Sequence, residues 1–439
     1  METVKRQTLK NGMSLIIAPQ KGAESMTLLV LIKVGSRYEP LKLNGASHFV
    51  EHLMFKGTER RPSTLMISKE LDRYGAEYNA YTGKDLTGYY IKMDAAHTDN
   101  AIDLLHDMLF HSLFDPKEMD RERMVITEEI KMYNDNPREH ISELLEQHLF
   151  TGSSLGRNIA GTRQSVEKIS RRDLVSYKDA YYIPSRMTVA IAGKITPDAV
   201  NRVKRTFGNV PRPKQTKDMP FACFKLPTKA KQPLALQKKD TEQTQMALSF
   251  YGLPFGHKDR HVASLLSNIL GGSMSSRLFT EIRERRGLCY AIGSSHESLE
   301  DIGSFTIAAG LDHSRLKEAI QAIYGELNKI IQENVGHEEL TLAKDHIRGR
   351  LSLAFEDSAV RAEWYGRQWL YERKVESPEA RVKQIQQITA GDIRRVAASI
   401  LVPRRMVLAA IGPSAEPKIF NKLVSCPASG RDPAAINFN

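Results

Sequence analysis

Residues 44–57 read NGASHFVEHLMFKG and contain two histidines and a glutamate in the pattern H-x-x-E-H. A serine precedes the first histidine and a glycine follows the motif, which predicts a short helix between them. On such a helix His48 and His52 are one turn apart and point to one side. Two neutral imidazoles at that spacing can both reach one Zn²⁺ ion, at about 2.0–2.1 Å. Glu51 flanks the same face and can take a proton from water at the metal without being a ligand.

A catalytic zinc site needs three protein ligands and one position open to water, so another ligand must come from elsewhere in the chain. Residues 119–134 are expected to form a long helix, because a capping aspartate and a first-turn proline precede them. This helix offers Glu122, Glu128 and Glu129. Glu122 and Glu129 are two turns apart on one face, whereas Glu128 points about 100° away. Spacing alone leaves the choice of ligand open.

Two segments of the chain match each other without a gap. SRRDL from residue 170 leads to PSRM from residue 184 and then to Gly193; TAGDI from residue 389 leads to PRRM from residue 403 and then to Gly412. Each pair is offset by 219 positions (403 − 184, 412 − 193). In both copies a capped helix, a proline and an apolar strand ended by glycine follow in order. A whole matching register indicates a duplicated domain.

The residues between the two copies are typical of a linker. Residues 210–243 are rich in Pro, Lys, Gln and Thr, and the prolines keep such a segment extended. We therefore expect a first domain at 1–212, a linker at 213–240 and a second domain at 241–439. Strands are expected at 14–17, 26–34, 88–93, 187–192, 245–251, 303–309 and 406–411. Strands joined by neighbouring helices predict an α+β fold, in which helices pack on one face of each sheet.

Composition excludes several classes of protein. The chain has 439 residues, of which 41% are hydrophobic and 26% charged, as is usual for a soluble protein of two or three domains. Without a signal peptide or an apolar run near the roughly 18 residues that span a bilayer, the sequence predicts a cytoplasmic protein with no membrane contact. Three distant cysteines do not form a disulfide framework. The net charge of +11 comes without a basic run interleaved with aromatics, so no nucleic-acid partner is expected.

These residues resemble the pitrilysin family of zinc metallopeptidases, in particular its short-chain members of the mitochondrial processing peptidase type. The motif at 48–52 is the inverted zinc motif of the inverzincins. The family places its third ligand, a glutamate, about 76 residues after the second histidine, and 76 residues lie between His52 and Glu129 here. A family glutamate seven positions earlier matches Glu122, which would support the site without binding the metal. Glu128 remains the adjacent alternative.

The resemblance extends over most of the chain, from about residue 14 to about residue 412. NAYT at 79–82, which includes Asn79 and Ala80, is similar to the edge strand that pairs with substrate backbone in the family. The segment from the glycine pair at 271–272 to residue 290 is similar to the family's substrate-binding region. Its arginine and tyrosine, seven apart, match Arg283 and Tyr290. The tail, 414–439, carries no part of the likeness.

The second half lacks a metal motif of its own. The best counterpart of the motif helix is 262–271, where His48, Glu51 and His52 are replaced by apolar residues, namely Val262, Leu265 and Leu266. The resemblance therefore implies one zinc per chain, with the second half left to bind substrate.

The resemblance implies two homologous α+β domains, each a mostly antiparallel sheet packed by helices, that enclose a chamber. It implies a zinc-dependent endopeptidase that hydrolyses peptides or unfolded segments bound as an extended strand. The metal ligands would be His48, His52 and Glu129, and Glu51 would activate zinc-bound water. A homodimer is expected, because the chain carries both parts of the site and is half as long as the family's four-domain members. The rival interpretations are a non-catalytic scaffold subunit of the same fold, against which the intact ligands argue, and a nucleic-acid-binding protein.

Overall fold

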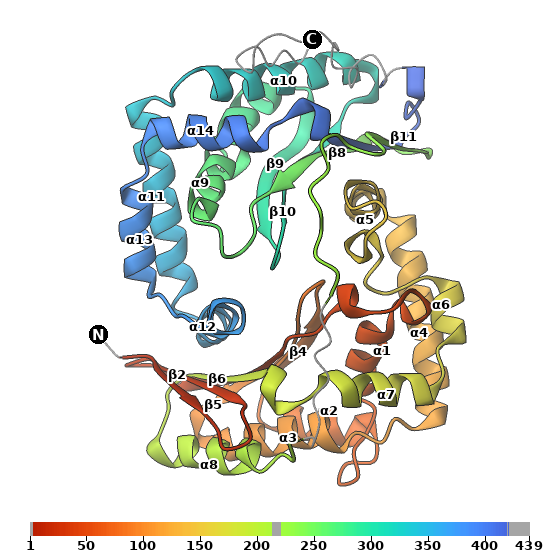
Figure 1. Ribbon diagram of the computed structural model, residues 1–439, viewed down its shortest axis with the longest axis vertical. Coiled ribbons are helices and arrows are strands. Elements are labelled where there is room, and N and C mark those ends of the chain that lie inside the picture. Colours follow the sequence, from red (N-terminus) through yellow and green to blue (C-terminus); the bar gives the residue numbers. More distant parts are fainter. Residues whose placement is uncertain (1–2, 213–220, 419, 421–439) are drawn as a thin grey trace. The chain divides into compact units, whose positions relative to one another are not determined.

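The computed structural model describes residues 3–212, 221–418 and 420, and it divides into two compact units (Figure 1). The first unit comprises Met1–Lys131, Arg157–Phe221 and Ser352–Glu376, and the second comprises Met132–Gly156, Ala222–Leu351 and Ser377–Asn439. Each unit contains one β-sheet with helices packed on it. The chain therefore has the α+β fold that the sequence predicts.

The sheet of the first unit has six strands in the order β1-β2-β6-β3-β5-β4. Only β2 and β6 run parallel, and the other neighbours are antiparallel. The strands are β1 Lys5–Thr8, β2 Ser14–Pro19, β3 Ser25–Ile32, β4 Glu77–Thr82, β5 Thr87–Asp94 and β6 Met187–Gly193. The helices are α1 Ala46–Leu53, α2 Thr64–Arg73, α3 Thr98–His111, α4 Pro116–Asp135, α6 Arg163–Lys168, α7 Arg171–Tyr181, α8 Pro197–Gly208 and α12 Ser358–Glu372, of which α4 runs on into the second unit.

The sheet of the second unit has five strands in the order β7-β11-β8-β10-β9, with only β7 and β11 parallel. The strands are β7 Leu234–Lys238, β8 Thr244–Gly252, β9 Cys289–Ser298, β10 Gly303–Leu311 and β11 Val407–Gly412. The helices are α5 Pro137–Leu149, α9 Arg260–Gly271, α10 Leu316–Gln332, α11 His337–Ala354, α13 Pro378–Gln386 and α14 Ala390–Ile400. The strands β2-β6-β3-β5-β4 of the first sheet correspond one by one to the strands β7-β11-β8-β10-β9 of the second.

The matching segments of the sequence form matching elements. Helices α7 and α14 differ by 219 positions at both ends (390 − 171, 400 − 181). Each begins with a reciprocal capping box, formed by Ser170 with Asp173 and by Thr389 with Asp392. The strands β6 and β11 end at the same offset (412 − 193) and occupy equivalent places in the two sheets. The structure therefore bears out the internal repeat.

Helices cover both faces of each sheet, whereas the sequence led us to expect one covered face. In β3, alternate residues such as Leu28 and Val30 enter the main core, and Leu29 and Leu31 are also buried. Leu31 meets α12, since a Cβ added to Gly366 would lie 2.9 Å from its Cδ1 atom. An unbroken apolar run of this kind is typical of strands buried on both sides.

The two outer helices are exchanged between the halves of the sequence. Helix α12 comes from the second half but packs on the first sheet, where Ser358 shares a 2.8 Å hydrogen bond with Thr27. Helix α5 comes from the first half, and its Ile141 and Leu145 pack against the second sheet. The compact units are therefore not simply residues 1–212 and 241–439.

The segment expected to be a linker contains strand β7. This strand pairs in parallel with β11, and the Leu408 N–H donates to the Pro233 carbonyl at 2.9 Å. A proline is tolerated there because β7 is an edge strand. Residues 213–220 of the expected linker and 421–439 of the tail lie outside the described residues.

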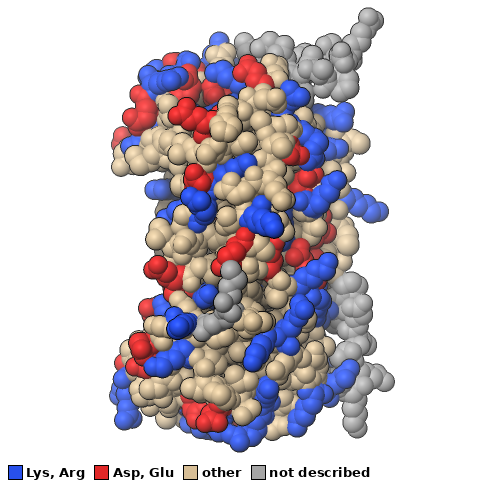
Figure 2. All heavy atoms as spheres, turned by 90° about the vertical axis from the view of Figure 1, so that its left-hand side faces the viewer, with Lys and Arg blue, Asp and Glu red and all other residues tan. Residues whose placement is uncertain are grey.

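Charged side chains are intermixed on the face shown in Figure 2. Lys and Arg side chains are spread over this face, with Asp and Glu side chains and uncharged surface between them. No helix among the described residues has the length and apolar character needed to cross a bilayer.

Candidate metal centre

Helix α1 carries His48, Glu51 and His52 and begins after Gly45. Gly45 has a φ of 99°, and a Cβ at this position would lie 2.7 Å from the carbonyl oxygen of Ala160. Both facts favour glycine there. The other side of the helix is buried by its apolar residues, which are Phe49, Val50 and Leu53. The two histidine rings are therefore turned away from the core, with their centroids 4.5 Å apart.

Helix α4 brings a glutamate to both histidines. Its first turn is capped by Asp115, whose Oδ1 accepts from the Lys117 N–H at 2.9 Å, as the sequence predicts. The Glu129 Oε2 atom lies 3.6 Å from the Nε2 atom of His48 and 3.6 Å from the Nε2 atom of His52. These three residues are the only group among the described residues whose His, Cys, Asp or Glu donor atoms converge in this way, within 4.8 Å of one another.

The neighbouring glutamate points elsewhere. The side chain of Glu128 is 69% exposed and pairs with Lys131 at 2.7 Å, whereas that of Glu129 is 24% exposed. The 100° between successive helical residues separates the two carboxylates. The geometry therefore favours Glu129 over Glu128 as the partner of the histidines.

The donor set fits a zinc ion. Tetrahedral ligand atoms at about 2.0–2.1 Å from a metal lie about 3.4 Å apart, and the two measured separations from Glu129 are 3.6 Å. These separations are too long for hydrogen bonds. The carboxylates of Glu51, Glu122 and Glu129 surround the histidines, and Lys56 is the cation that pairs with one of them. A divalent cation would offset the excess negative charge.

Glu122 contacts the His52 ring nitrogen that is not near Glu129. The Glu122 Oε2 atom lies 2.9 Å from His52 Nδ1, and its Oε1 atom lies 2.7 Å from Lys56 Nζ. Burial acts to raise the pKa of Glu122, but the bonds with His52 and Lys56 lower it below its ordinary value. An ionised Glu122 accepts a hydrogen bond from the Nδ1–H of His52, which leaves the Nε2 lone pair available to a metal.

The two histidines differ in their electrostatic surroundings. Burial, and then the nearby His52, lower the pKa of His48 to about 4, so this ring is neutral, as a metal ligand must be. Burial also acts to lower the pKa of His52, but its bond to Glu122 and the nearby Glu129 carboxylate raise it to about 9. Without a metal, the carboxylates therefore draw a proton to His52.

Glu51 contacts strand β4. The Thr82 hydroxyl donates a hydrogen bond to its Oε2 atom. Burial raises the pKa of Glu51 above its usual range, although the Thr82 bond acts in the opposite direction. A carboxyl group with a raised pKa is suited to accept and then release a proton near neutral pH.

The strand that carries Thr82 also carries Asn79 and Ala80, and it lies at the edge of the sheet. Among the described residues it pairs with β5 alone, which leaves its outer edge available to another strand. The Ala80 N–H donates to the Asn79 side chain at 2.9 Å. On the other face of β4, the Tyr81 hydroxyl donates to Glu363 of α12.

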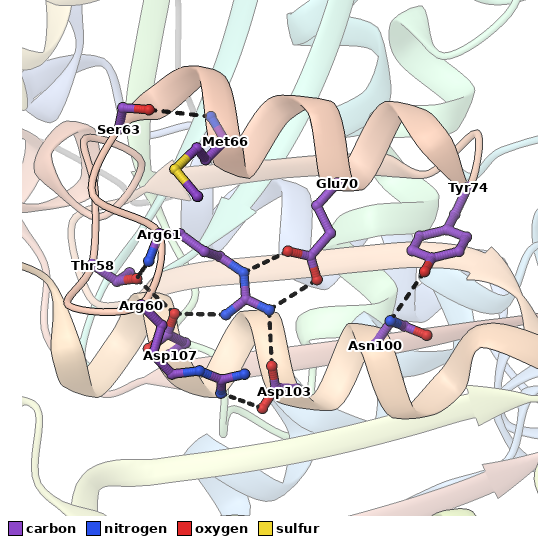
Figure 3. A network of polar contacts seen from close by, with 10 residues as sticks. All are labelled: Thr58, Arg60, Arg61, Ser63, Met66, Glu70, Tyr74, Asn100, Asp103 and Asp107. Carbon is purple, nitrogen blue, oxygen red and sulfur yellow. Dashed lines mark hydrogen bonds and ion pairs between the residues drawn. The ribbon is translucent and has the colours of Figure 1, made fainter.

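A buried ion-pair network anchors the chain that leaves α1 (Figure 3). The Arg61 guanidinium binds Glu70 of α2 at 2.6 and 2.8 Å and Asp103 of α3 at 2.8 Å. It also binds Asp107 at 2.7 Å, and Asp107 accepts from Thr58 at 2.6 Å. Arg60, which is exposed, adds a bond to Asp103. The network fixes the segment after α1 to two neighbouring helices, α2 and α3.

Arg283 and Tyr290 lie together in the second unit. Arg283 belongs to a π-helix, Phe279–Glu284, an uncommon conformation that recurs at functional sites. Its guanidinium carbon is 4.6 Å from the centre of the Phe279 ring and 5.3 Å from that of Tyr290. Tyr290 is largely exposed. The structure therefore brings the guanidinium group and the phenol ring together.

The second unit repeats the helix without the donors. Helix α9 occupies the place of α1, and Val262, Leu265 and Leu266 are buried in the core of this unit. Their burial explains why apolar residues stand at these positions.

Sequence reasoning missed two side chains of this site. Thr82 lies in the NAYT segment, but its bond to Glu51 depends on the fold bringing β4 to α1. Lys56 follows His52 by four residues, and that spacing alone could have suggested a shared face.

Two family models match the chain. Residues 15–163 match the model described as insulinase, peptidase family M16, and residues 168–347 match that described as the peptidase M16 inactive domain. A Bacillus subtilis protein named as the uncharacterized zinc protease YmxG is 36% identical over 358 residues, which cover 81% of this chain and 85% of that protein.

Two solved structures have the same fold. A protease from Helicobacter pylori superposes with a TM-score of 0.86 at 23% identity, covering 94% of this chain and 99% of that one. A peptidase M16 inactive domain from Pseudomonas fluorescens gives a TM-score of 0.84 at 18% identity, covering 94% and 98%.

Proposed function

The chain belongs to peptidase family M16, and on that basis we propose that it is a zinc-dependent endopeptidase. The observation that carries the proposal is the convergence of His48, His52 and Glu129, with Glu51 beside them on α1. The zinc protease named above supports the choice of metal. A zinc ion bound there would supply Lewis-acid chemistry, which polarises a carbonyl group and lowers the pKa of water.

We propose that Glu51 is the general base. It accepts a proton from the water molecule whose oxygen forms a bond to the scissile carbonyl carbon. It then gives this proton to the amine nitrogen as the carbon–nitrogen bond breaks. The Thr82 hydroxyl keeps the carboxylate oriented through this sequence.

The substrate binds as an added strand along the outer edge of β4. A peptide carbonyl takes the place of the Asn79 side chain as the acceptor for the Ala80 N–H. Backbone hydrogen bonds carry most of the affinity in this mode, so many sequences are accepted. Arg283 and Tyr290 bind substrate from the second unit, and the chain acts as a homodimer.

The test combines metal content with hydrolysis of a fluorescently labelled unfolded protein. The wild type should hold one zinc per chain and lose activity when a chelator removes it. Glu51→Gln should keep the zinc and lose about 10²–10⁴-fold in turnover, because glutamine preserves the shape but accepts no proton. Near-normal turnover in the zinc-loaded variant would place the base elsewhere. A zinc-loaded wild type that hydrolyses nothing would indicate the scaffold role instead.

A further inference from the structure

A buried carboxylate outside the motif contacts the first turn of the metal-binding helix. Glu39, 3% exposed, lies in the segment between β3 and α1. Its Oε1 atom accepts from the Ser47 N–H at 2.7 Å, and its Oε2 atom accepts from the Gly45 N–H at 2.8 Å. The Asn44 side chain donates to the same Oε2 atom at 3.1 Å.

Helix α1 depends on this carboxylate because its own cap position has no side chain. The first N–H groups of a helix have no partner within it, and a Ser, Thr, Asp or Asn usually supplies one. Here Gly45 is required by its left-handed backbone and by the close carbonyl of Ala160. A carboxylate six residues upstream supplies the missing acceptor, and its negative charge suits the helix N-terminus.

The turn that Glu39 holds is the turn that carries His48. Metal-binding histidines are usually oriented by a partner on the other ring nitrogen. His52 has such a partner in Glu122, at 2.9 Å. The Nδ1 atom of His48 is buried and has no hydrogen-bond partner among the described residues. The direction of the His48 ring therefore depends on the backbone of the first turn, and so on Glu39.

Burial acts against the charged form of Glu39. It raises the pKa of this carboxyl group to about 7, in spite of the bonds from Ser47, Gly45 and Asn44. Burying a charged group is costly even when it is well bonded. The hydrogen bonds to Glu39 therefore hold the backbone at the start of α1 even though burying this carboxylate is unfavourable.

We propose that Glu39 is a positioning residue that fixes His48 for metal binding by holding the first turn of α1. The inference rests on the proposed zinc site. It adds a residue that touches neither metal nor substrate and acts only through the backbone.

The test measures zinc affinity rather than activity. Metal-free protein is titrated with zinc in competition with a chromophoric chelator, and its melting temperature is recorded separately. Glu39→Gln replaces one carboxylate oxygen by an amide N–H₂ group, which cannot accept the hydrogen bond from a backbone N–H of Gly45 or Ser47. Its zinc affinity should fall by about 10–100-fold, the usual effect of losing a group that supports a ligand.

The control is Glu326→Gln, which alters another buried glutamate, paired with Lys329 in the second unit. It should lower the melting temperature and leave zinc affinity unchanged. If Glu39→Gln behaves like this control, Glu39 is only a structural cap and the inference is wrong. If the wild type itself binds no zinc, the proposed function fails first.

A milder variant keeps the inference testable if Glu39→Gln does not fold. Asn44→Ala removes one donor to Glu39 and leaves its charge in place. It should weaken zinc binding in the same direction but to a smaller extent. A folded Asn44→Ala protein with wild-type zinc affinity would then overturn the inference.

Discussion

Replacing Glu129 with glutamine tests the metal site most directly. The change removes the charge of a side chain whose Oε2 atom is 3.6 Å from both histidine Nε2 atoms. Losing a group that only supports a ligand costs about 10–100-fold in metal affinity, so losing an anionic ligand should cost more than about 100-fold. That factor corresponds to more than about 2.8 kcal/mol, at 1.4 kcal/mol per tenfold change.

Glu128→Gln is the matched control, one residue away on the same helix. The side chain of Glu128 is 69% exposed and pairs with Lys131, spaced i, i+3. Such a pair contributes about 0.2–0.5 kcal/mol to a helix. Zinc affinity in Glu128→Gln should therefore stay near that of the wild type.

The assay is a competition titration of metal-free protein with zinc and a chromophoric chelator, with circular dichroism to show that each variant is folded. A large loss in Glu129→Gln and almost none in Glu128→Gln is the expected result. The reverse order would make Glu128 the ligand and contradict the geometry of α4. Equal, small losses in both would show that neither glutamate binds the metal.

Two further changes probe the fold and the assembly. Arg61→Met should destabilise the metal-free protein by about 3–5 kcal/mol in urea unfolding, because it leaves buried carboxylates such as Asp107 without their cation. Arg60→Met, which breaks only an exposed pair with Asp103, should cost about 0–1 kcal/mol, and equal effects would refute this ranking. In the proposed homodimer, mixing Glu51→Gln chains with Arg283→Ala chains should restore part of the activity if one site uses both protomers, as measured by hydrolysis after mixing. A dimer without rescue would place both groups of each site in one chain, and a fully active monomer would contradict the dimer.

The sequence predicted the elements that follow local rules. The Asp115 cap of α4, the two capping boxes and the strands β6 and β11 depend on neighbours in the chain. The boxes and the strands were placed within one residue, and α4 begins three residues before the expected 119. The H-x-x-E-H motif placed both histidines on one helix face for the same reason. The choice of Glu129 over Glu128 needed the spacing between the second histidine and the glutamate in the family. The two glutamates are adjacent in the sequence, and the pattern of residues around them does not distinguish them.

The sequence did not predict contacts between distant segments. The Thr82 bond to Glu51 and the Glu39 cap on α1 each depend on how a strand or loop returns to the helix. The coverage of both sheet faces was missed because no local pattern indicates that α12 packs on a sheet formed more than 150 residues earlier. Strand β7 was missed because the prolines and lysines around it are typical of a linker, and its pairing is set by β11.

The exchange of α12 also determines when the first sheet can be completed during synthesis. The last strand of that sheet ends at Gly193, and α12 begins at Ser358, 165 residues later (358 − 193). At about 5–20 residues per second, the ribosome needs about 8 to 33 s to make that stretch. During this time the face that includes Leu31 and Ala190 has no helix to cover it, because Gly366 packs there only in the finished chain. A nascent chain paused within this interval therefore presents an apolar sheet face to chaperones or to other nascent chains.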